Sequence, residues 1–499
     1  MSFTVILYKY TIMMDHLFLY FLSFVLFGVW YSKPEWKIAA IPAFLSLFAS
    51  LYYIYGSEGF HLESLKHMGL DLLVLSAHLF ILQLFKHFKW AILLVLPLGF
   101  SMWISHTIVQ SSIDVPDHPE ILIKFKSDEV AKSIFDEFGY SIDSYELAFS
   151  VSDIRSTDLD DYYVIDLKEV VDPSKFVQKL KNNKNVEWIE ENQKVEIPEL
   201  EGLNNFADLK SNTFNDPLSG GQWHVDAFNI SAMHEKLAKS KTKQKKKVTI
   251  AILDTGVDSK HEDLSAVYKS SGDKKFDSDQ KGHGTHCAGI AAAVSNNKTG
   301  IASILPKNSK IQVMSIQVLN NYGYGTQQTI INGILKAADL NADVISLSLG
   351  GMTSEAKERA YRRAVDYANE KGSIVVVAAG NSSKNAKNFS PANTKGVIAV
   401  TAVDEKMNLA VFANTVDDLK MGIAAPGVNI LSTVPNNEYK QFSGTSMATP
   451  FVAGMVALLK SYYPDITTKE AYEKITSGSI SIQSSKTPIM LPDQIVDNF

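Results

Sequence analysis

The chain has 499 residues, of which 48 are basic and 54 acidic, and its formal net charge is −6. This balance gives no sign of nucleic acid as a partner. The hydrophobic share of 46% is too high for a disordered chain. The single cysteine, Cys287, excludes an internal disulfide framework and a multi-cysteine zinc site. Only 11 charged residues fall in the first 110, so one all-soluble globule is not expected.

Four charge-free runs occupy the amino-terminal part, at residues 16–32, 38–57, 72–85 and 90–113. A helix needs roughly 17–25 residues to cross the hydrocarbon layer. The third run reaches that length only if Asp71 lies in the headgroup zone. Several such runs in succession disfavour a signal peptide. We therefore expect an α-helical transmembrane module over residues 1–113 with about four spans, three spans being the alternative.

The lysines of this module predict its orientation. The first and third loops carry two lysines each, whereas the second loop and the amino terminus carry one each. Lysine-bearing loops favour the cytoplasm. With four spans, the rest of this multi-pass membrane protein lies on the extracytoplasmic side, and with three spans it lies on the opposite side. The lipid membrane is then a partner of the chain.

Residues 114–200 alternate strand and helix patterns. Strands are expected at 121–126, 145–151, 162–167 and 186–195, and helices at 128–138 and 173–182. The order β-α-β-β-α-β predicts a ferredoxin-like α+β domain. It contains no cluster of candidate catalytic side chains. Residues 201–215, rich in Glu, Asn, Gly and Ser, predict an exposed linker.

From residue 216 to 499 the pattern changes to short apolar runs that alternate with helical segments. Three of these runs end at Asp254, at Gly350 and at Gly380. Near-continuous apolar strands separated by helices predict an α/β domain with a doubly wound, mostly parallel sheet. In such sheets the site lies beyond the carboxyl ends of the strands. Polar residues at these points are therefore the candidates for function.

Three short segments supply a nucleophilic constellation. Asp254 follows a strand, His283 precedes an Ala/Gly-rich helix, and Ser446 begins another helix. A serine hydroxyl is a weak nucleophile until a base removes its proton, and that base needs a carboxylate to hold its tautomer. Each residue alone has an ordinary structural explanation, such as a helix cap. Together, with glycines close to each, they indicate an Asp-His-Ser triad.

At these residues the chain resembles the subtilisin-like serine proteases. The segments that carry the resemblance are Ile-Leu-Asp-Thr-Gly-Val-Asp at 252–258, His-Gly-Thr-His-Cys-Ala-Gly at 283–289 and Gly-Thr-Ser-Met-Ala-Thr-Pro at 444–450. The resemblance covers about residues 215–463 and implies a serine endopeptidase that acts on polypeptides. A dedicated processing or signalling protease of membrane-proximal proteins is the alternative with the same chemistry. A catalytically silent binding module on the same fold is the alternative from another class, which the complete triad disfavours.

The resemblance implies further site residues. It assigns Asn381 as the side-chain donor of the oxyanion hole, a role for a neutral amide aimed at the developing charge. It also implies two strand edges that pair with extended substrate, and a first specificity pocket lined by small residues. These substrate-binding residues are Ser348, Leu349 and Gly350 on one edge, Gly323, Tyr324 and Gly325 on the other, and Ala378, Ala379 and Gly380 in the pocket.

The resemblance also implies a structural calcium ion. Carboxylate, amide and carbonyl oxygens suit this cation. The implied ligands are Asp216, Asp263, Val294, Asn297, Thr299 and Ile301. Cys287, four residues after His283, belongs to an HGTHC variant that resembles the thermitase and proteinase K branches. We expect it to be a packed neighbour that confers mercury sensitivity, not a nucleophile.

Finally, the resemblance gives residues 114–200 a role as a propeptide that assists folding and then blocks the cleft as an intramolecular inhibitor. Parallel sheets fold slowly because their contacts are non-local, which gives such a template a physical rationale. The chain would then be a membrane-anchored, self-processing zymogen that is cut within about residues 198–215. Release of the protease from the membrane after processing is an open alternative.

Overall fold

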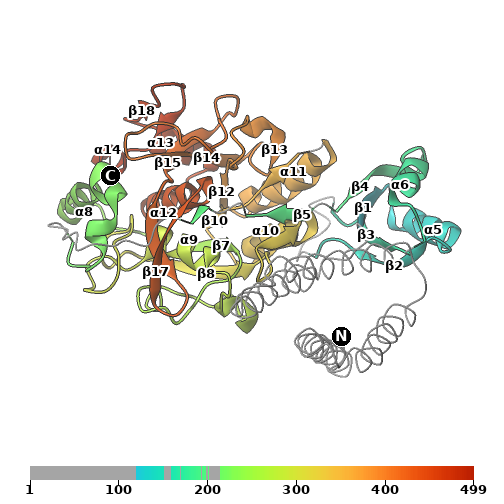
Figure 1. Cartoon of the computed structure of the whole chain (residues 1–499), viewed down its shortest axis with the longest axis horizontal. Coiled ribbons are helices and arrows are strands. Elements are labelled where there is room, and N and C mark those ends of the chain that lie inside the picture. Colours follow the sequence, from blue (N-terminus) through green and yellow to red (C-terminus); the bar gives the residue numbers. More distant parts are fainter. Residues whose placement is uncertain are drawn as a thin grey trace, which may run out of the picture. The chain divides into compact units, whose positions relative to one another are not determined.

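The structure is a computed structural model that describes residues 120–150, 159–168, 170–192, 194–197, 200–201, 214–353 and 355–498 (Figure 1). By contacts the chain divides into two units, Met1–Ile113 and Asp114–Phe499. All the predicted membrane spans lie outside the described residues, as does most of the predicted linker. Within the described residues, no helix combines the length and the apolar character needed to cross a bilayer.

The first described domain has the predicted element order β-α-β-β-α-β. Its antiparallel sheet has the strand order β2-β3-β1-β4. Its elements are β1 (Ile121–Phe125), α5 (Asp128–Phe138), β2 (Ile142–Leu147), β3 (Tyr162–Leu167), α6 (Pro173–Lys181) and β4 (Val186–Glu191). Helix α6 begins where predicted because Asp172 caps it, accepting bonds from the N–H groups of Ser174 and Lys175.

The two faces of this small sheet are buried against different neighbours. One face packs on α5 and α6, through residues such as Ile123 and Ile165. The other face, including Leu122, Tyr162 and Trp188, belongs to the same apolar cluster as side chains of the larger domain. Successive side chains of a strand point to opposite faces of the sheet. In β1, Ile123 therefore packs on the helices while Leu122 packs on the large domain. The small domain is therefore packed onto the large one by one face of its sheet.

The large domain contains the predicted parallel sheet. Its order is β18-β19-β15-β14-β12-β10-β7-β8, and all its neighbouring pairs are parallel except the antiparallel β18 and β19. Its strands are β7 (Val248–Asp254), β8 (Ile311–Gln317), β10 (Val344–Leu347), β12 (Ile374–Ala378), β14 (Val397–Val403), β15 (Gly422–Pro426), β18 (Ile480–Ser481) and β19 (Pro488–Ile489).

Helices cover both faces of this sheet (Figure 1). On one side, Ile250 and Ile252 pack with α9 and α12, and on the other, Ala251 and Leu253 pack with α10 and α11. This burial on both faces explains why the strands are apolar at nearly every position. The helices of the domain are α7 (Trp223–Ala227), α8 (Ile230–Lys239), α9 (His283–Ala292), α10 (Gln327–Asp339), α11 (Glu355–Glu370), α12 (Thr445–Tyr462), α13 (Thr468–Ile475) and α14 (Pro492–Ile495).

The predicted last strand of the small domain, residues 186–195, is wrong in its extent. Strand β4 ends at Glu191, and β5 (Lys194–Glu196) pairs antiparallel with β9 (Tyr324–Thr326) of the large domain. Asn192 directly follows β4, and its N–H still donates to the carbonyl oxygen of Glu120 at 2.7 Å. Beyond it, β6 (Leu200–Glu201) pairs with β17 (Glu438–Ser443), which itself pairs with β16 (Ile430–Val434). The chain thus leaves the small domain as two short strands that belong to the large one.

Candidate active site

Asp254 and His283 meet at the carboxyl edge of the sheet. Asp254 is the last residue of β7 and His283 the first of α9, and His283 Nδ1 lies 2.7 Å from Asp254 Oδ1. Both side chains are buried. Gly284 must be a glycine, because a Cβ there would overlap the carbonyl oxygen of Gly256. The glycines around the histidine therefore allow the helix to approach the aspartate closely.

Ser446 lies in the first turn of α12. Its Oγ donates to the carbonyl oxygen of Ser348 at 3.1 Å. His283 Nε2 has no hydrogen-bond partner among the described residues. The triad is therefore assembled on its Asp-His side, while the serine hydroxyl bonds to a neighbouring carbonyl. The hydrogen bond between a catalytic serine and its histidine commonly forms or shortens only when substrate binds.

The electrostatics suit a base held by a carboxylate. Burial opposes a charge on His283, but the Asp254 carboxylate overcomes this effect and raises the pKa of His283 well above its ordinary value. Asp254 Oδ1 also accepts the N–H of Thr255 at 2.8 Å. The pair therefore favours proton uptake at His283 and directs Nε2 away from Asp254.

Asn381 has an amide whose orientation is set by Thr445. Both the N–H and the hydroxyl of Thr445 donate to Asn381 Oδ1, each at 2.9 Å. The hydroxyl in turn accepts the N–H of Gly380 at 3.1 Å. With its oxygen held, the amide directs Nδ2 towards Gly444, where it lies 3.1 Å from the place a Cβ would occupy. A donor thus faces the loop that carries Ser446, as an oxyanion hole requires.

A buried carboxylate that the sequence analysis missed ties the Asp and His loops together. Asp279 accepts from the Thr255 hydroxyl at 2.9 Å, and from the N–H and hydroxyl of Thr285 at 2.9 and 2.7 Å. It also accepts the N–H groups of Lys281 and Gly282. Burial raises the pKa of Asp279. The sequence did contain a signal for this residue, since Asp279 lies four residues before His283 and its partner Thr255 lies in the motif at 252–258. Thr445 likewise lies in the motif at 444–450.

Cys287 is buried beside the triad. Its Sγ lies 4.0 Å from His283 Nδ1 and donates to the carbonyl oxygen of Ser446 at 3.6 Å. Burial raises the pKa of this thiol. A protonated, buried thiol is a poor nucleophile. The geometry agrees with a packed neighbour.

The predicted substrate edges are next to the chain's own residues 194–201. Val195 lies opposite Gly325, and Glu196 opposite Tyr324. On the other side, a Cβ at Gly351, which directly follows the predicted edge Ser348–Gly350, would lie 3.9 Å from Val195 Cγ2. Further along the sequence, Leu200 pairs with Ser443, three residues before Ser446. One described end of this segment therefore lies beside β9 and Gly351, and the other pairs with the strand that precedes Ser446.

Of the three small residues predicted to line the specificity pocket, at least two are buried in the structure. Ala378 and Ala379 are buried, and Ala379 and Leu349 belong to an apolar core cluster. Gly380 has a φ of +98°, and a Cβ there would lie 2.6 Å from Asn414 Nδ2, so only glycine fits. Of the three small residues, Gly380 is thus the one placed directly beside Thr445.

The implied calcium ligands do come together. Asp216 accepts the N–H groups of Asn296 and Asn297 at 2.7 and 2.9 Å, and Asp263 accepts the Asn297 amide at 2.7 Å and the Ile301 N–H at 2.9 Å. Burial raises the pKa of Asp263 to about 7, and the nearby charge of Asp216 adds to the effect. Among the described residues neither carboxylate forms an ion pair with Lys or Arg. Val294 and Thr299 lie in the same loop, so the donor set fits a hard cation.

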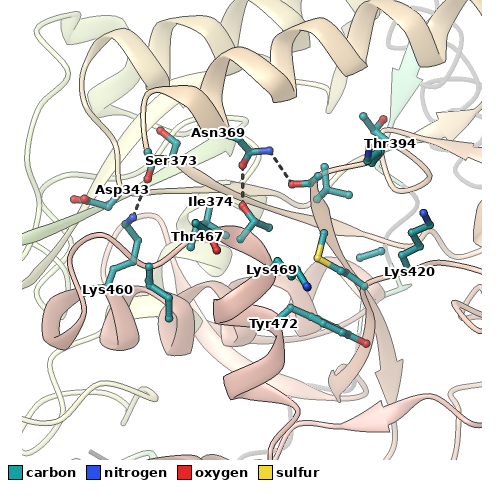
Figure 2. Close-up of a pocket in the computed structure, with 18 of the residues that line it drawn as sticks. Asp343, Asn369, Ser373, Ile374, Thr394, Lys420, Lys460, Thr467, Lys469 and Tyr472 are labelled. Carbon is teal, nitrogen blue, oxygen red and sulfur yellow. Dashed lines mark hydrogen bonds between the residues drawn. The ribbon is translucent and has the colours of Figure 1, made fainter.

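A large cavity lies elsewhere, beside residues that precede the parallel strands. Its volume is about 1230 Å³, and it is lined by Asp343, Ile374, Val397 and Lys460 among others (Figure 2). Asp343, Ile374 and Val397 are at the amino ends of β10, β12 and β14, and Lys460 lies in the second half of α12, whereas Asp254 is at the carboxyl end of β7. None of the predicted site residues lines this cavity. It is therefore distinct from the triad.

The buried Asp-His pair, the serine at a helix amino end and the oriented amide define a serine hydrolase on a doubly wound sheet. The model of the subtilase family, Peptidase_S8, matches residues 245–485. Thermitase of Thermoactinomyces vulgaris is 46% identical over 240 residues, which cover 46% of this chain and 81% of thermitase. Subtilisin DY of Bacillus licheniformis is 39% identical over 244 residues, covering 48% and 85%. The chain belongs to the subtilase family and is a subtilisin-like serine endopeptidase.

A third relative aligns with a larger part of the chain. The thermostable alkaline protease of Halalkalibacterium halodurans is 34% identical over 312 residues, which cover 62% of this chain and 76% of that protein. The aligned part of this chain contains more residues than the stretch from Phe214 to residue 499. The similarity therefore extends into the residues that precede the large domain.

Proposed function

We propose that this enzyme cleaves extended polypeptides through an acyl-enzyme formed on Ser446. His283 Nε2 accepts the hydroxyl proton as Oγ attacks the scissile carbonyl, and then gives it to the leaving amine. Water attacks the acyl-enzyme with His283 again acting as base, which releases the acid. Asp254 holds the tautomer of His283, and Asn381 donates to the tetrahedral oxyanion. The 2.7 Å contact between His283 and Asp254 at the sheet edge is the observation that carries this proposal.

Residues 114–200 are proposed to be a propeptide that inhibits its own peptidase domain, residues 216–499. Three contacts support this role: the sheet face with Tyr162 and Trp188 packs against the large domain, β5 pairs with β9, and β6 pairs with β17. Main-chain pairing of this kind also suits substrates of varied sequence. Processing falls between about residue 198 and Asn215, because Asp216 must remain attached to the loop that it holds.

Calcium is proposed as a structural cofactor. Asp216, Asp263, Asn297 and the carbonyl oxygens of the loop from Val294 to Ile301 would hold it. Bound there, the ion supplies positive charge to two buried carboxylates. Rotating the Asn297 amide by half a turn would present its oxygen in place of the nitrogen that now faces Asp263. Loss of the ion would leave the negative charges of these carboxylates uncompensated. The contact between Asp216 and the loop at Asn296 and Asn297 would then weaken.

The zymogen is proposed to be anchored in the membrane by residues 1–113, with the peptidase on the extracytoplasmic side. The support is the sequence: charge-free runs long enough to span and lysines concentrated in two loops. A dedicated role in processing membrane-proximal proteins would follow from that location. Labelling engineered cysteines in the first loop tests it, since labelling from outside is incompatible with this orientation.

The central experiment compares the wild-type full chain with Ser446→Ala, and uses Ser484→Ala, an exposed distant serine, as the matched control. We expect the wild type and the control to hydrolyse casein and to yield a fragment that begins between about residues 198 and 216. The Ser446→Ala chain should show neither property. An intact, casein-inactive wild type, or a Ser446→Ala chain that is still processed by itself, would refute the zymogen mechanism.

A further inference from the structure

The amino ends of the parallel strands form a lysine-rich edge of the large domain, opposite the edge where Asp254 lies. An exposed lysine is found within the three residues before each of five strands: Lys247 before β7, Lys310 before β8, Lys371 before β12, Lys395 before β14 and Lys420 before β15. Because these strands are all parallel, their amino ends lie on the same side of the sheet. The five lysines are therefore gathered on one face of the domain.

The loop before β7 adds more positive charge to this face. Residues 239–247 contain six lysines and no acidic residue. The loop is held to the domain, because the N–H groups of Lys245 and Lys246 donate to the carbonyl oxygen of Ser461 at 2.7 and 3.2 Å. Four of its lysines are exposed and form no ion pair with any other described residue: Lys241, Lys243, Lys245 and Lys247.

The large cavity at the same edge continues the positive surface. Its lining contains seven basic side chains and five acidic ones, and Lys420 and Lys469 are labelled among them in Figure 2. Lys395 and Lys420 are exposed and, in the part of the chain that the structure describes, have no acidic partner within ion-pair distance. The chain as a whole has a net charge of −6. The rest of the molecule therefore has an excess of negative charge.

An aromatic side chain lies among these lysines. Tyr463 is half-buried just after α12, and its ring centre lies 4.6 Å from Lys474 Nζ and 5.9 Å from Lys245 Nζ. Tyrosine is enriched where proteins meet the interface between membrane and water. Lysines next to an anionic bilayer are attracted by its negative surface potential. Exposed lysines around a tyrosine thus have the chemistry that the headgroup layer of an anionic membrane binds.

We propose that this basic face, formed by residues 239–247 with Lys310, Lys395 and Lys420, docks on the surface of a bilayer that contains anionic lipids. This inference rests on the proposed membrane location of the chain and adds which side of the peptidase domain meets the lipid. A flat bilayer touches the basic face alone. A long soluble polyanion would also meet the negatively charged remainder of the surface, which would repel it.

Docking in this way sets the direction of the cleft. Strand β7 has seven residues, so it separates the two edges of the sheet by about 20 Å. The triad, at the carboxyl edge, would then lie roughly that far beyond the docked face, which is about two Debye lengths in physiological salt. The cleft would open towards solvent, and substrates would be cleaved at points well clear of the lipid headgroups.

The test uses the full-length Ser446→Ala chain, which cannot process itself, in vesicles of phosphatidylcholine or of an equal mixture of phosphatidylcholine and phosphatidylglycerol. A membrane-impermeant reagent acetylates exposed lysines, and mass spectrometry measures the rate at each one. The internal controls are exposed lysines that follow the carboxyl ends of β7 and β14: Lys260, Lys274, Lys275 and Lys406. One variant combines Lys241→Gln, Lys243→Gln, Lys245→Gln and Lys247→Gln. Its matched control combines Lys260→Gln, Lys274→Gln, Lys275→Gln and Lys406→Gln.

We expect acetylation of Lys310, Lys395 and Lys420 to be about threefold slower on the anionic vesicles than on the neutral ones, because the surface potential holds these lysines against the lipid. The rates at the internal controls should not change. The protection should disappear at high salt, be lost in the variant without the loop lysines, and persist in its matched control.

Equal rates on the two kinds of vesicle, or full protection in the variant without the loop lysines, would overturn the inference. So would protection by soluble polyphosphate in the absence of protection by anionic vesicles. Flotation with neutral vesicles tests the anchoring by residues 1–113 separately, since neutral lipid gives the basic face no counter-charge. A chain that floats only with anionic vesicles would refute the anchoring and support the basic face, and one that floats with neither would refute both.

Discussion

Thr445 offers a test of the oxyanion hole, because its hydroxyl donates to the Asn381 oxygen and so helps to orient the Asn381 amide. Replacing Thr445 by Val keeps the volume of this buried residue and removes its hydroxyl. The Asn381 oxygen then keeps one donor of two, the N–H of residue 445. A lost hydrogen bond of about 1 kcal/mol weakens the preference for the correct amide orientation roughly fivefold. In the inverted orientation an oxygen faces the developing oxyanion.

We therefore expect Thr445→Val to lower kcat by about twofold to tenfold with little change in KM, measured on a peptide substrate. This loss is small beside the 10²–10³-fold, on the order of 3 kcal/mol, that removal of an oxyanion donor by Asn381→Ala should cost. Thr445→Ser keeps the hydroxyl and is the matched control. In an Asn381→Ala background the valine substitution should cause no further loss of kcat. An equal loss in that background, or an equal loss in Thr445→Ser, would refute the role of the hydroxyl.

Three further predictions follow from the buried groups. Burial lowers the pKa of His224 and of His286 to about 3, whereas the unfolded chain binds these protons near pH 6.5. The free energy of unfolding should thus fall by about 1.4 kcal/mol per pH unit per histidine as the pH drops from about 6.5 towards 3; urea titrations of the Ser446→Ala chain check this, and an unchanged slope in His286→Gln would contradict it. Asp279→Ala should lower kcat more than it raises KM, because Thr255 and Thr285 lose their common acceptor; equal melting temperatures and unchanged kcat would exclude a positioning role. Chelation should lower the melting temperature of the wild type, with a smaller effect in Asp263→Asn; calorimetry with and without added calcium measures both.

The sequence predicted those parts of the molecule that depend on local patterns. Apolar strands followed by Asp254, and glycines around His283, are signals that lie within a few residues of each other, and the structure has the expected sheet and the Asp-His contact. The partners of Thr445 and Asp279 depend instead on how separate loops approach one another. The same is true of β5, whose residues continue the pattern of β4 but find their partner in β9, more than a hundred residues further along the chain. The hydrophobic pattern of residues 194–196 contains no information about their pairing with β9.

Because β5 and β6 both pair with strands of the peptidase domain, the position of the first cut determines how the inhibitor leaves the cleft. A cut after Glu201, within residues 202–213, would leave β5 and β6 on one fragment, so the released inhibitor would still hold the cleft at two points joined by a short tether. Its dissociation would then be slow, since either strand can rebind while the other stays bound. A cut between Ile197 and Leu200 would leave β5 on the inhibitor and β6 on the amino-terminal end of the enzyme, so the inhibitor would hold the cleft at one point and dissociate faster. The position of the cut, and not only its occurrence, would therefore set the delay between maturation and activity.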